Sequence, residues 1–468
     1  MASPVNYLKN LGVANGNPKR ERDWLIGANS YQLQQLAEEL YLELMQLCAS
    51  GTTPKIILAE RQPERFLAGF LAACAANCPV FLCNPDWGTQ EWQKVFDLVK
   101  PDIIWGDLKK LNLLSPSSPS SPSPSHSPLI MIPTGGSSGQ IKFAIHTWET
   151  LITSVQGFQK YFNLNSINSF CVLPLYHVSG LMQFMRAFTT GGQLAILPFK
   201  NLESGQIYNI ETSDFFISLV PTQLQRLLQN PELTKWISKF QTVMLGGAPA
   251  WDELLEKARF HSIRLAPTYG MTETASQIAT LKPDDFLNGK VNSGRILPHA
   301  QVTVRNEKGE ILNNNQIGNI VIKAKSLALG YYPKLWENQD YFQVDDVGFL
   351  DAQGYLNILG RNSDKIISGG ENIYPAEIES AIRATQMVND ICVIGVPDTH
   401  WGQVLTAIYI PKESYTSLEI KTVIQDKLSK FKIPKHWISV TTLPCNPQGK
   451  INRQKLQLLV FPVINLKM

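Results

Sequence analysis

The segment "TGGSSGQIK", residues 134–142, gathers glycines, hydroxyl side chains and one lysine in a short run. Glycine permits positive φ and lets a ligand approach the backbone closely. Backbone N–H groups, hydroxyl donors and one mobile ammonium group are what a polyphosphate needs. The run lacks the Walker order of Gly, four residues and Gly-Lys-Ser/Thr. We therefore predict a phosphate loop of another kind, with a plain glycine turn as the alternative, formed by Thr134, Gly135, Gly136, Ser137, Ser138, Gly139 and Lys142.

Three later segments are also dense in polar and glycine residues. "PTYGMTETAS" (267–276) places one carboxylate, Glu273, after an aromatic residue and hydroxyls. A helix N-cap arrangement of the [S/T]-x-x-E type is the structural alternative there. Residues 345–379 carry acidic residues, Arg361 and glycine turns, and residues 443–456 place Lys450 after a glycine. For Lys450 the alternative is a solvated loop lysine.

These segments need a scaffold, and the pattern of the chain indicates an α/β fold. Apolar residues at helical spacing predict helices over residues 31–49 and 65–78. Strands are predicted by short apolar runs at residues 55–60, 79–85, 102–107, 129–134, 169–175, 193–199, 215–221 and 242–248. Strands that alternate with helices favour a mostly parallel, doubly wound sheet. The glycine loop is expected between strand 129–134 and a helix beginning near residue 147.

The sequence pattern changes from alternating helices and strands to strands and turns at about residue 295. Alternation and Asn/Gly turns in 300–324 and 348–361 predict antiparallel strands, as in a small β-barrel. An α/β stretch and a basic helix over 417–435 follow. We expect a large domain over residues 1–361 and a smaller α+β domain over 362–468. Residues 115–128 contain only Ser, Pro and one His, which predicts an extended surface loop of the large domain.

Composition limits the classes of function. The formal charge is +3, from 42 basic and 39 acidic residues, which argues against nucleic acid as the main partner. The seven cysteines are scattered, so we expect buried small residues and no zinc site. No apolar signal region or membrane-spanning run is present, so a cytoplasmic protein without an integral membrane segment is expected. A homodimer is left open.

In order and spacing, the four motif segments resemble those of the adenylate-forming superfamily, which includes acyl- and aryl-CoA ligases, nonribosomal peptide adenylation domains and firefly luciferase. The resemblance spans roughly residues 25–460. It implies a large N-terminal domain and a smaller, mobile C-terminal lid. It also implies two half-reactions. A carboxylate attacks the α-phosphate of ATP with Mg²⁺, giving acyl-AMP and pyrophosphate, and a thiol, usually that of coenzyme A, then displaces AMP.

The resemblance assigns roles by position. Glu273 would hold Mg²⁺, Thr272 would touch the α-phosphate, and Lys450 would bridge the carboxylate and the α-phosphate. Tyr269 would stack on adenine, and Asp346 and Arg361 would reach the ribose. The nucleotide site would be completed by the loop residues already named and by Gly247, Ala248, Gly270 and Met271.

The same resemblance makes Ser363 and Asp364 the hinge of the lid. Rotation would withdraw Lys450 and bring Ser368, Gly369 and Gly370 to the thiol channel. The chain departs from the usual pattern in the loop, where Gly135 replaces Ser and Ile141 replaces Pro. It also departs at residues 344–346, which read Val-Asp-Asp where Thr-Gly-Asp is common.

Residues 173–196, 218–228 and 366–379 resemble the o-succinylbenzoate–CoA ligases of menaquinone and phylloquinone biosynthesis. His177 falls where that family places an acyl-pocket residue, with a packed core histidine as the alternative. Arg226 could pair with a second substrate carboxylate, because a guanidinium matches carboxylate geometry; a surface arginine is its alternative. Ser179 and Thr222 are further pocket candidates. The competing functions are another aryl- or fatty-acyl-CoA ligase, a carrier-loading adenylation domain and a luciferase-type oxygenase. The carrier-loading function is less favoured, because no carrier segment follows the ligase region.

Overall fold

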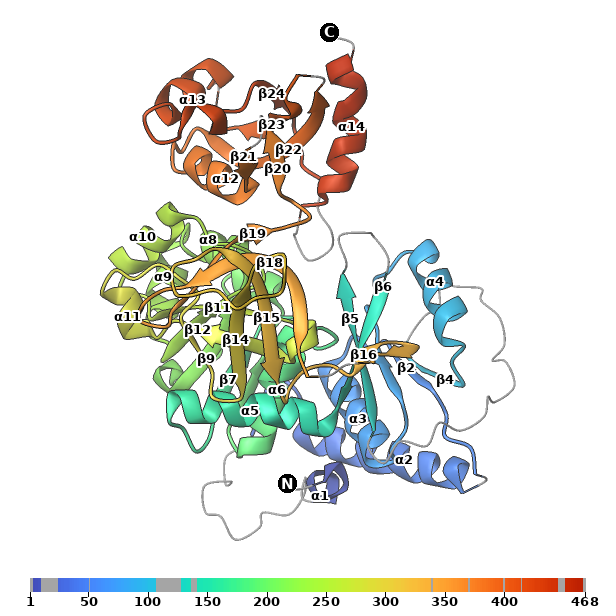
Figure 1. Cartoon of the computed structure of the whole chain (residues 1–468). Helices are drawn as coiled ribbons and strands as arrows, with labels where there is room; N and C mark the ends of the chain where they lie inside the picture. The colour runs from blue at the N-terminus through green and yellow to red at the C-terminus, as the bar shows by residue number, and fades with distance from the viewer. Residues whose placement is uncertain are drawn as a thin grey trace.

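The computed structural model describes residues 3–9, 24–49, 51–106, 128–135, 141–337, 340–368, 371–398, 400–413, 415–444 and 451–465. The chain is mixed α/β, with a large N-terminal domain and a small C-terminal domain, as the sequence predicts (Figure 1). The part of the Ser/Pro segment up to residue 127 lies outside the described residues.

The first sheet of the large domain has seven strands in the order β17-β16-β6-β5-β3-β2-β4. Its β2, β3, β4 and β5 are parallel, whereas the pairs β5–β6, β6–β16 and β16–β17 are antiparallel. The bounds are β2 (Ile56–Leu58), β3 (Val80–Leu82), β4 (Ile103–Trp105), β5 (Leu129–Gly135), β6 (Ile141–Thr147), β16 (Gly330–Tyr331) and β17 (Lys334–Leu335).

The second sheet has eight strands in the order β1-β8-β7-β9-β10-β11-β12-β13, parallel from β1 to β11. The predicted mostly parallel arrangement is therefore confirmed. The bounds are β1 (Leu25–Ile26), β7 (Asn168–Cys171), β8 (Leu194–Ile196), β9 (Phe215–Leu219), β10 (Thr242–Leu245), β11 (Leu265–Met271), β12 (Ser276–Thr280) and β13 (Arg295–Ile296).

Helices fill the space between these two sheets and cover their outer faces. Alternate strand residues face opposite sides of a sheet, so Ile56 and Leu58 pack into the shared core while Ile57 faces the outer cluster. The shared core receives α2 (Ser30–Cys48), α3 (Pro63–Ala75), α5 (Trp148–Phe162) and α6 (Val178–Thr190). The outer clusters receive α4 (Thr89–Val99) on one side and α8 (Pro221–Leu227), α9 (Pro231–Ile237) and α10 (Asp252–Phe260) on the other. Shorter helices are α1 (Pro4–Lys9), α7 (Phe199–Glu203) and α11 (Pro283–Leu287).

The antiparallel strands expected as a small barrel form a four-stranded sheet in the order β14-β15-β18-β19, whose two end strands do not pair in the described chain. One face packs on Ile278 and Ala279 of β12. The bounds are β14 (Ala300–Arg305), β15 (Gly318–Ala324), β18 (Phe342–Leu350) and β19 (Leu356–Arg361).

The C-terminal part forms a separate lobe beyond β19 (Figure 1). Its sheet is covered by α12 and α13 on one face and by α14 on the other. The bounds are β20 (Ile366–Ser368), β21 (Glu371–Ile373), α12 (Pro375–Arg383), β22 (Val388–Asp398), β23 (Gly402–Pro411), α13 (Ser417–Ile424), β24 (His436–Ser439) and α14 (Arg453–Asn465).

Two local predictions were wrong. The glycine loop does not lead from a strand into a helix, because β6 intervenes and pairs antiparallel with β5 before α5 begins. The alternation of Ile141, Phe143 and Ile145 is a strand signal, since strand side chains alternate between faces. The basic helix over 417–435 ends at Ile424, because its buried contacts come from Ile420 and Ile424 and the following residues are mostly exposed.

Candidate active site

Nine of the predicted site residues lie at or after the carboxyl ends of adjacent parallel strands. His177 and Ser179 follow β7, Thr222 and Arg226 follow β9, and Gly247 and Ala248 follow β10. Tyr269, Gly270 and Met271 form the end of β11, the next strand in the same sheet. Open α/β sheets bind ligands outside the carboxyl ends of their strands. The topology therefore brings residues separated by almost a hundred positions to one edge of the eight-stranded sheet.

Glu273 is the buried carboxylate of this edge. It lies in the 3₁₀ turn Thr272–Thr274 and is 7% exposed. Its Oε1 accepts hydrogen bonds from Tyr331 Oη at 2.5 Å and Thr134 Oγ1 at 3.4 Å. Thr134 is the second-last residue of β5 and Tyr331 lies in β16, so both donors come from the seven-stranded sheet. Glu273 therefore joins the eight-stranded sheet to the seven-stranded sheet.

Tyr331 is a site residue that the motif analysis missed. Burial and the Glu273 carboxylate raise the pKa of its phenol, so the hydroxyl stays a donor at neutral pH. The ammonium group of Lys142 lies 5.4 Å from the centre of the Tyr331 ring, and Lys142 pairs with Thr134 across the β5–β6 hairpin. The available signal was the run "GYYP" at 330–333, but nothing local in it indicates Glu273.

The backbone of the turn that carries Glu273 accepts hydrogen bonds from other parts of the chain. Ala328 N–H donates to the Glu273 carbonyl at 2.8 Å, and Ser326 Oγ donates to the Thr274 carbonyl at 3.0 Å. The Thr272 carbonyl accepts from His146 Nε2 at 2.8 Å. These contacts hold the turn in one conformation, which is what a preorganised site requires.

His146 is a second residue that the motif analysis missed. Because Nε2 faces a carbonyl it must carry the proton, which leaves Nδ1 unprotonated, 3.0 Å from Thr150 Oγ1. Burial lowers the pKa of His146 to about 4, and the ring is neutral at physiological pH. His146 lies in β6 and Thr150 in α5. The imidazole therefore fixes the Thr272 backbone to the hairpin strand.

Asp346, Tyr269 and Arg361 form a second polar group. Asp346, in β18, is 8% exposed, and its Oδ2 accepts from Tyr269 Oη at 2.6 Å. Arg361 Nε, at the end of β19, lies 3.3 Å from Asp346 Oδ1. Burial and Asp346 raise the pKa of Tyr269, and Glu273 adds to this effect. Tyr269 therefore contacts Asp346 directly and is within electrostatic range of Glu273.

The predicted hinge begins two residues after Arg361. The Ser363 N–H and hydroxyl both donate to the Asp345 carboxylate, so Asp345 anchors the start of this segment. Asp364 Oδ2 lies 3.6 Å from Arg453 Nε, at the start of α14. Ser368 is buried in β20. Ser363 is thus held by Asp345, whereas Asp364, the next residue, pairs with Arg453 of α14.

The acyl-pocket candidates differ in burial. His177 is the N-cap residue of α6, and burial lowers its pKa to about 4. Ser179 is half-buried in the first turn of α6, whereas Thr222 is exposed in the first turn of α8. The Arg226 side chain is 57% exposed and lies 3.5 Å from Glu203 Oε1. An exposed pair of this kind is weak and leaves Arg226 able to exchange partners.

The remaining nucleotide candidates lie partly outside the described residues. Gly247 and Ala248 are exposed, and Gly247 has a φ of +83°, which glycine adopts without strain. Gly135 is the last residue of β5. The predicted residues that lie outside the described part of the chain are Gly136, Ser137, Ser138, Gly139, Gly369, Gly370 and Lys450.

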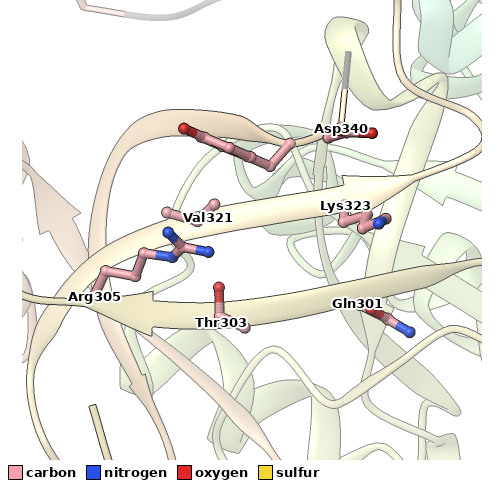
Figure 2. A pocket seen from close by; sticks show the side chains of 7 residues that line it. Gln301, Thr303, Arg305, Val321, Lys323 and Asp340 are labelled. Carbon is pink, nitrogen blue, oxygen red and sulfur yellow. The ribbon is translucent and has the colours of Figure 1, made fainter. Parts of the chain in front are cut away.

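A shallow hollow of about 230 Å³ lies elsewhere, on the exposed face of β14 and β15 (Figure 2). Arg305 and Lys323 approach it with Asp340 and Tyr341. None of the predicted site residues lines it. The strand-end position and the two polar groups, rather than this hollow, define the candidate site.

Family models match the chain at both domains. A model of the AMP-binding enzyme family matches residues 106–332, and a model of the AMP-binding enzyme C-terminal domain matches residues 377–450. The chain belongs to the AMP-binding enzyme family. The resemblance inferred from the motifs is thereby confirmed.

Relatives of this chain include proteins named 2-succinylbenzoate–CoA ligase. The protein of this name from Listeria monocytogenes serotype 4b (strain F2365) is 35% identical over 337 residues, covering 69% of this chain and 68% of the relative. That of Enterococcus faecalis (strain ATCC 700802 / V583) is 30% identical over 375 residues, covering 79% and 77%. A solved structure with the same fold is o-succinylbenzoate CoA synthetase (MenE) from Bacillus subtilis in complex with the acyl-adenylate intermediate OSB-AMP. Its TM-score is 0.81 at 23% identity, covering 97% of this chain and 98% of that one.

Membrane spans and metal clusters are two other features to consider in the part of the chain that the structure describes. None of the helices found there is long and apolar enough to cross a membrane. The same residues contain no group of three or more His, Cys, Asp or Glu side chains placed to hold a metal ion. Five of the six described cysteines are buried, as expected for small apolar residues.

Proposed function

We propose that this chain is an AMP-forming 2-succinylbenzoate–CoA ligase. It would activate the acid with ATP and transfer the acyl group to coenzyme A, in menaquinone or phylloquinone biosynthesis. The names of the curated relatives support the substrate. The observation that carries the proposal is the pair of buried carboxylates, Glu273 in the turn after β11 and Asp346 in β18, of which Asp346 accepts a hydrogen bond from Tyr269 of β11.

The polar groups suit a nucleotide with Mg²⁺. Asp346 offers two oxygens to a ribose, and Arg361 lies beside it. Thr134 and Lys142 flank the glycine hairpin that would hold the β- and γ-phosphates. Mg²⁺ prefers few carboxylate ligands together with substrate phosphates, so the single buried Glu273 fits it. The bound ion would neutralise phosphate charge, while Tyr331 and Thr134 orient the carboxylate.

The proposed chemistry has two balanced steps. In the first, a carboxylate oxygen of the acid forms a bond to the α-phosphorus, and the bond from that phosphorus to the bridging oxygen breaks to release pyrophosphate. In the second, the thiol sulfur of coenzyme A bonds to the acyl carbon, the acyl–oxygen bond breaks, AMP leaves and the thiol proton passes to solvent. Lys450 would serve the first step by drawing the two anions together.

The two steps would use different positions of the C-terminal domain. We propose a boundary between residues 361 and 362, with Ser363 and Asp364 as the hinge. The contacts of Ser363 with Asp345 and of Asp364 with Arg453 connect this short segment to both sides. Rotation would replace Lys450 by Ser368, Gly369 and Gly370 beside the thiol channel.

The acyl group would lie next to α6 and α8. His177, neutral at physiological pH, would pack against the aromatic ring of the substrate with Ser179 nearby. Thr222 and Arg226 lie one turn apart on α8, and Arg226 would exchange Glu203 for the second carboxylate of the acid.

A pyrophosphate-release assay tests this function. The purified chain is supplied with ATP, Mg²⁺ and coenzyme A and with a panel of acids: o-succinylbenzoate, benzoate, a coumarate, a medium-chain fatty acid and malonate. Turnover fastest on o-succinylbenzoate is expected. Faster turnover on a monocarboxylate would instead indicate another acyl-CoA ligase, and no dependence on coenzyme A would indicate a different second step.

The proposal also includes a cytoplasmic location and leaves room for a homodimer. Free cysteines at all six described positions are consistent with a reducing compartment. Sedimentation equilibrium of the purified protein measures the oligomeric state, and fractionation of the source cell measures the location.

A further inference from the structure

Arg186 is a buried residue of α6 that contacts β12, the strand that follows the turn carrying Glu273. The residue is 4% exposed. Its Nη2 donates to Ser276 Oγ at 2.8 Å and to Gln277 Oε1 at 2.7 Å. The guanidinium carbon lies 4.4 Å from the centre of the Phe158 ring in α5. The side chain is thus fixed between two helices and β12.

The two acceptors of Arg186 adjoin the nucleotide motif. In the β11–β12 register, Ser276 pairs with Met271 and Gln277 pairs with Gly270. Arg186 is therefore separated from the predicted nucleotide-binding strand by one strand. No part of the sequence pattern indicated this, because Arg186 precedes Ser276 by 90 residues.

The backbone that Arg186 contacts is strained. Ala275 has a φ of +53° and Ser276 a φ of +117°, which residues with a side chain rarely adopt. Such conformations persist where the surroundings hold them, and they cluster at functional sites. Ser154 Oγ, in α5, donates to the Ala275 carbonyl at 2.9 Å, and Arg186 holds the Ser276 hydroxyl. The two helices together fix the turn that follows Glu273.

The charge of Arg186 has no acidic partner in the described structure. None of the ion pairs found there includes it, and its Nε lacks a hydrogen-bond partner. Burial lowers the pKa of Arg186 to about 9, so the guanidinium still carries its charge at neutral pH. A buried cation without a carboxylate is costly, and an anionic ligand bound nearby would offset that cost.

We propose that Arg186 is a positioning residue for the nucleotide site. It fixes the strained Ala275–Ser276 backbone, and thereby Glu273, and its uncompensated charge favours a polyphosphate in front of β11. The inference rests on the proposed function, since ATP is taken as the ligand.

The test compares Arg186→Met, Arg186→Lys and Ser276→Ala with the wild type. Calorimetric titration with MgATP, without any acid, measures the dissociation constant. Hydrogen–deuterium exchange measures the protection of residues 270–280 in the unliganded protein. Arg186→Met removes the charge-assisted hydrogen bonds to Ser276 and Gln277 and the buried positive charge. We expect the dissociation constant for MgATP to rise roughly tenfold or more. Arg186→Lys should raise the dissociation constant less. In all three variants, the amides of residues 270–280 should exchange faster than in the wild type, while the rest of the chain exchanges at the wild-type rate.

Arg259→Met is the matched control. Arg259 also stacks on a phenylalanine, 4.6 Å from the Phe286 ring, and donates to the Phe286 carbonyl, but it lies in α10. Its loss should leave ATP affinity and exchange at 270–280 unchanged. Unchanged affinity and exchange in Arg186→Met would overturn the inference. If that variant does not fold, Arg186→Lys and Ser276→Ala decide it in the same way. If the wild type itself binds no ATP, the proposed function fails, and the exchange measurement still tests the positioning role.

Discussion

The Tyr331 hydroxyl donates to Glu273 Oε1 at 2.5 Å, from a strand of one sheet to a turn at the edge of the other. Tyr331→Phe removes this donor and leaves Glu273 with the long Thr134 contact. A hydrogen bond to a charged group contributes about 1.5–3 kcal/mol. We expect the KM for MgATP to rise and acyl-adenylate formation to slow by roughly ten- to a hundredfold. Single-turnover pyrophosphate release measures both effects.

Tyr332→Phe is the control for this prediction. Tyr332 is the next residue, but its ring packs on Phe81, with the ring centres 4.8 Å apart. Losing its hydroxyl should leave the KM for MgATP unchanged. Equal effects of the two substitutions would mean that the Tyr331 hydroxyl has no special relation to Glu273.

Asp346→Asn tests the second polar group. The change keeps the shape of the side chain but removes the charge that faces Arg361 Nε, 3.3 Å away. We expect weaker binding of ATP, by about 1.5–3 kcal/mol if both ribose contacts are lost. Comparison of ATP with 2′-deoxy-ATP gives the decisive reading. The wild type should prefer ATP and the variant should discriminate less; an undiminished preference would separate Asp346 from the ribose.

The sequence predicted the scaffold better than the contacts. Leucines recur at helical spacing in residues 31–49, and α2 forms there. Short apolar runs predicted the parallel strands, which form at those runs. Tyr331 and His146 were missed because their partners lie 58 and 126 residues away, where no local pattern reports them. The sequence analysis expected a helix after the glycine loop and therefore missed β6, which pairs antiparallel with β5. Periodicity constrains elements, whereas side-chain partners depend on tertiary packing.

Acid should destabilise the protein through its buried histidines. The pKa values of His146, His177 and His299 are each lowered to about 4 by burial, with the charge of Arg186 contributing at His299. Between about pH 6.5 and pH 4 these residues take up protons in the unfolded state and remain neutral in the folded state. The free energy of unfolding should therefore fall as the pH falls, by up to about 1.4 kcal/mol per pH unit for each residue.

Urea unfolding at pH 7.5, 6.0 and 5.0 measures this dependence. His299→Leu is the informative variant, because neither ring nitrogen of His299 has a hydrogen-bond partner in the described structure. It should reduce the pH dependence of stability without loss of stability at pH 7.5. An unaltered pH dependence would show that His299 titrates alike in both states.

Lys450→Ala separates the two half-reactions. The proposal gives Lys450 a part in adenylation alone, so the variant should lose acyl-AMP formation by several orders of magnitude. It should still convert supplied acyl-AMP and coenzyme A to the thioester at close to the wild-type rate. Lys455→Ala, on the exposed start of α14, is the control and should retain both rates. Equal loss of both half-reactions in Lys450→Ala would contradict the assigned role and the need for two positions of the lid.

Arg226→Ala tests the recognition of a second carboxylate. In the structure Arg226 faces Glu203, and both side chains are substantially exposed, so this pair contributes little to stability. The substitution should therefore leave the free energy of unfolding within about 0.5 kcal/mol of the wild type. The KM for o-succinylbenzoate should rise by roughly ten- to a hundredfold, while that for ATP changes little. Glu203→Ala provides the opposite case: it frees the guanidinium and should leave the KM for the acid unchanged or lower. If Arg226→Ala leaves the KM for the dicarboxylate unchanged, Arg226 does not contact the acid, and the second carboxylate must bind to another group of the site.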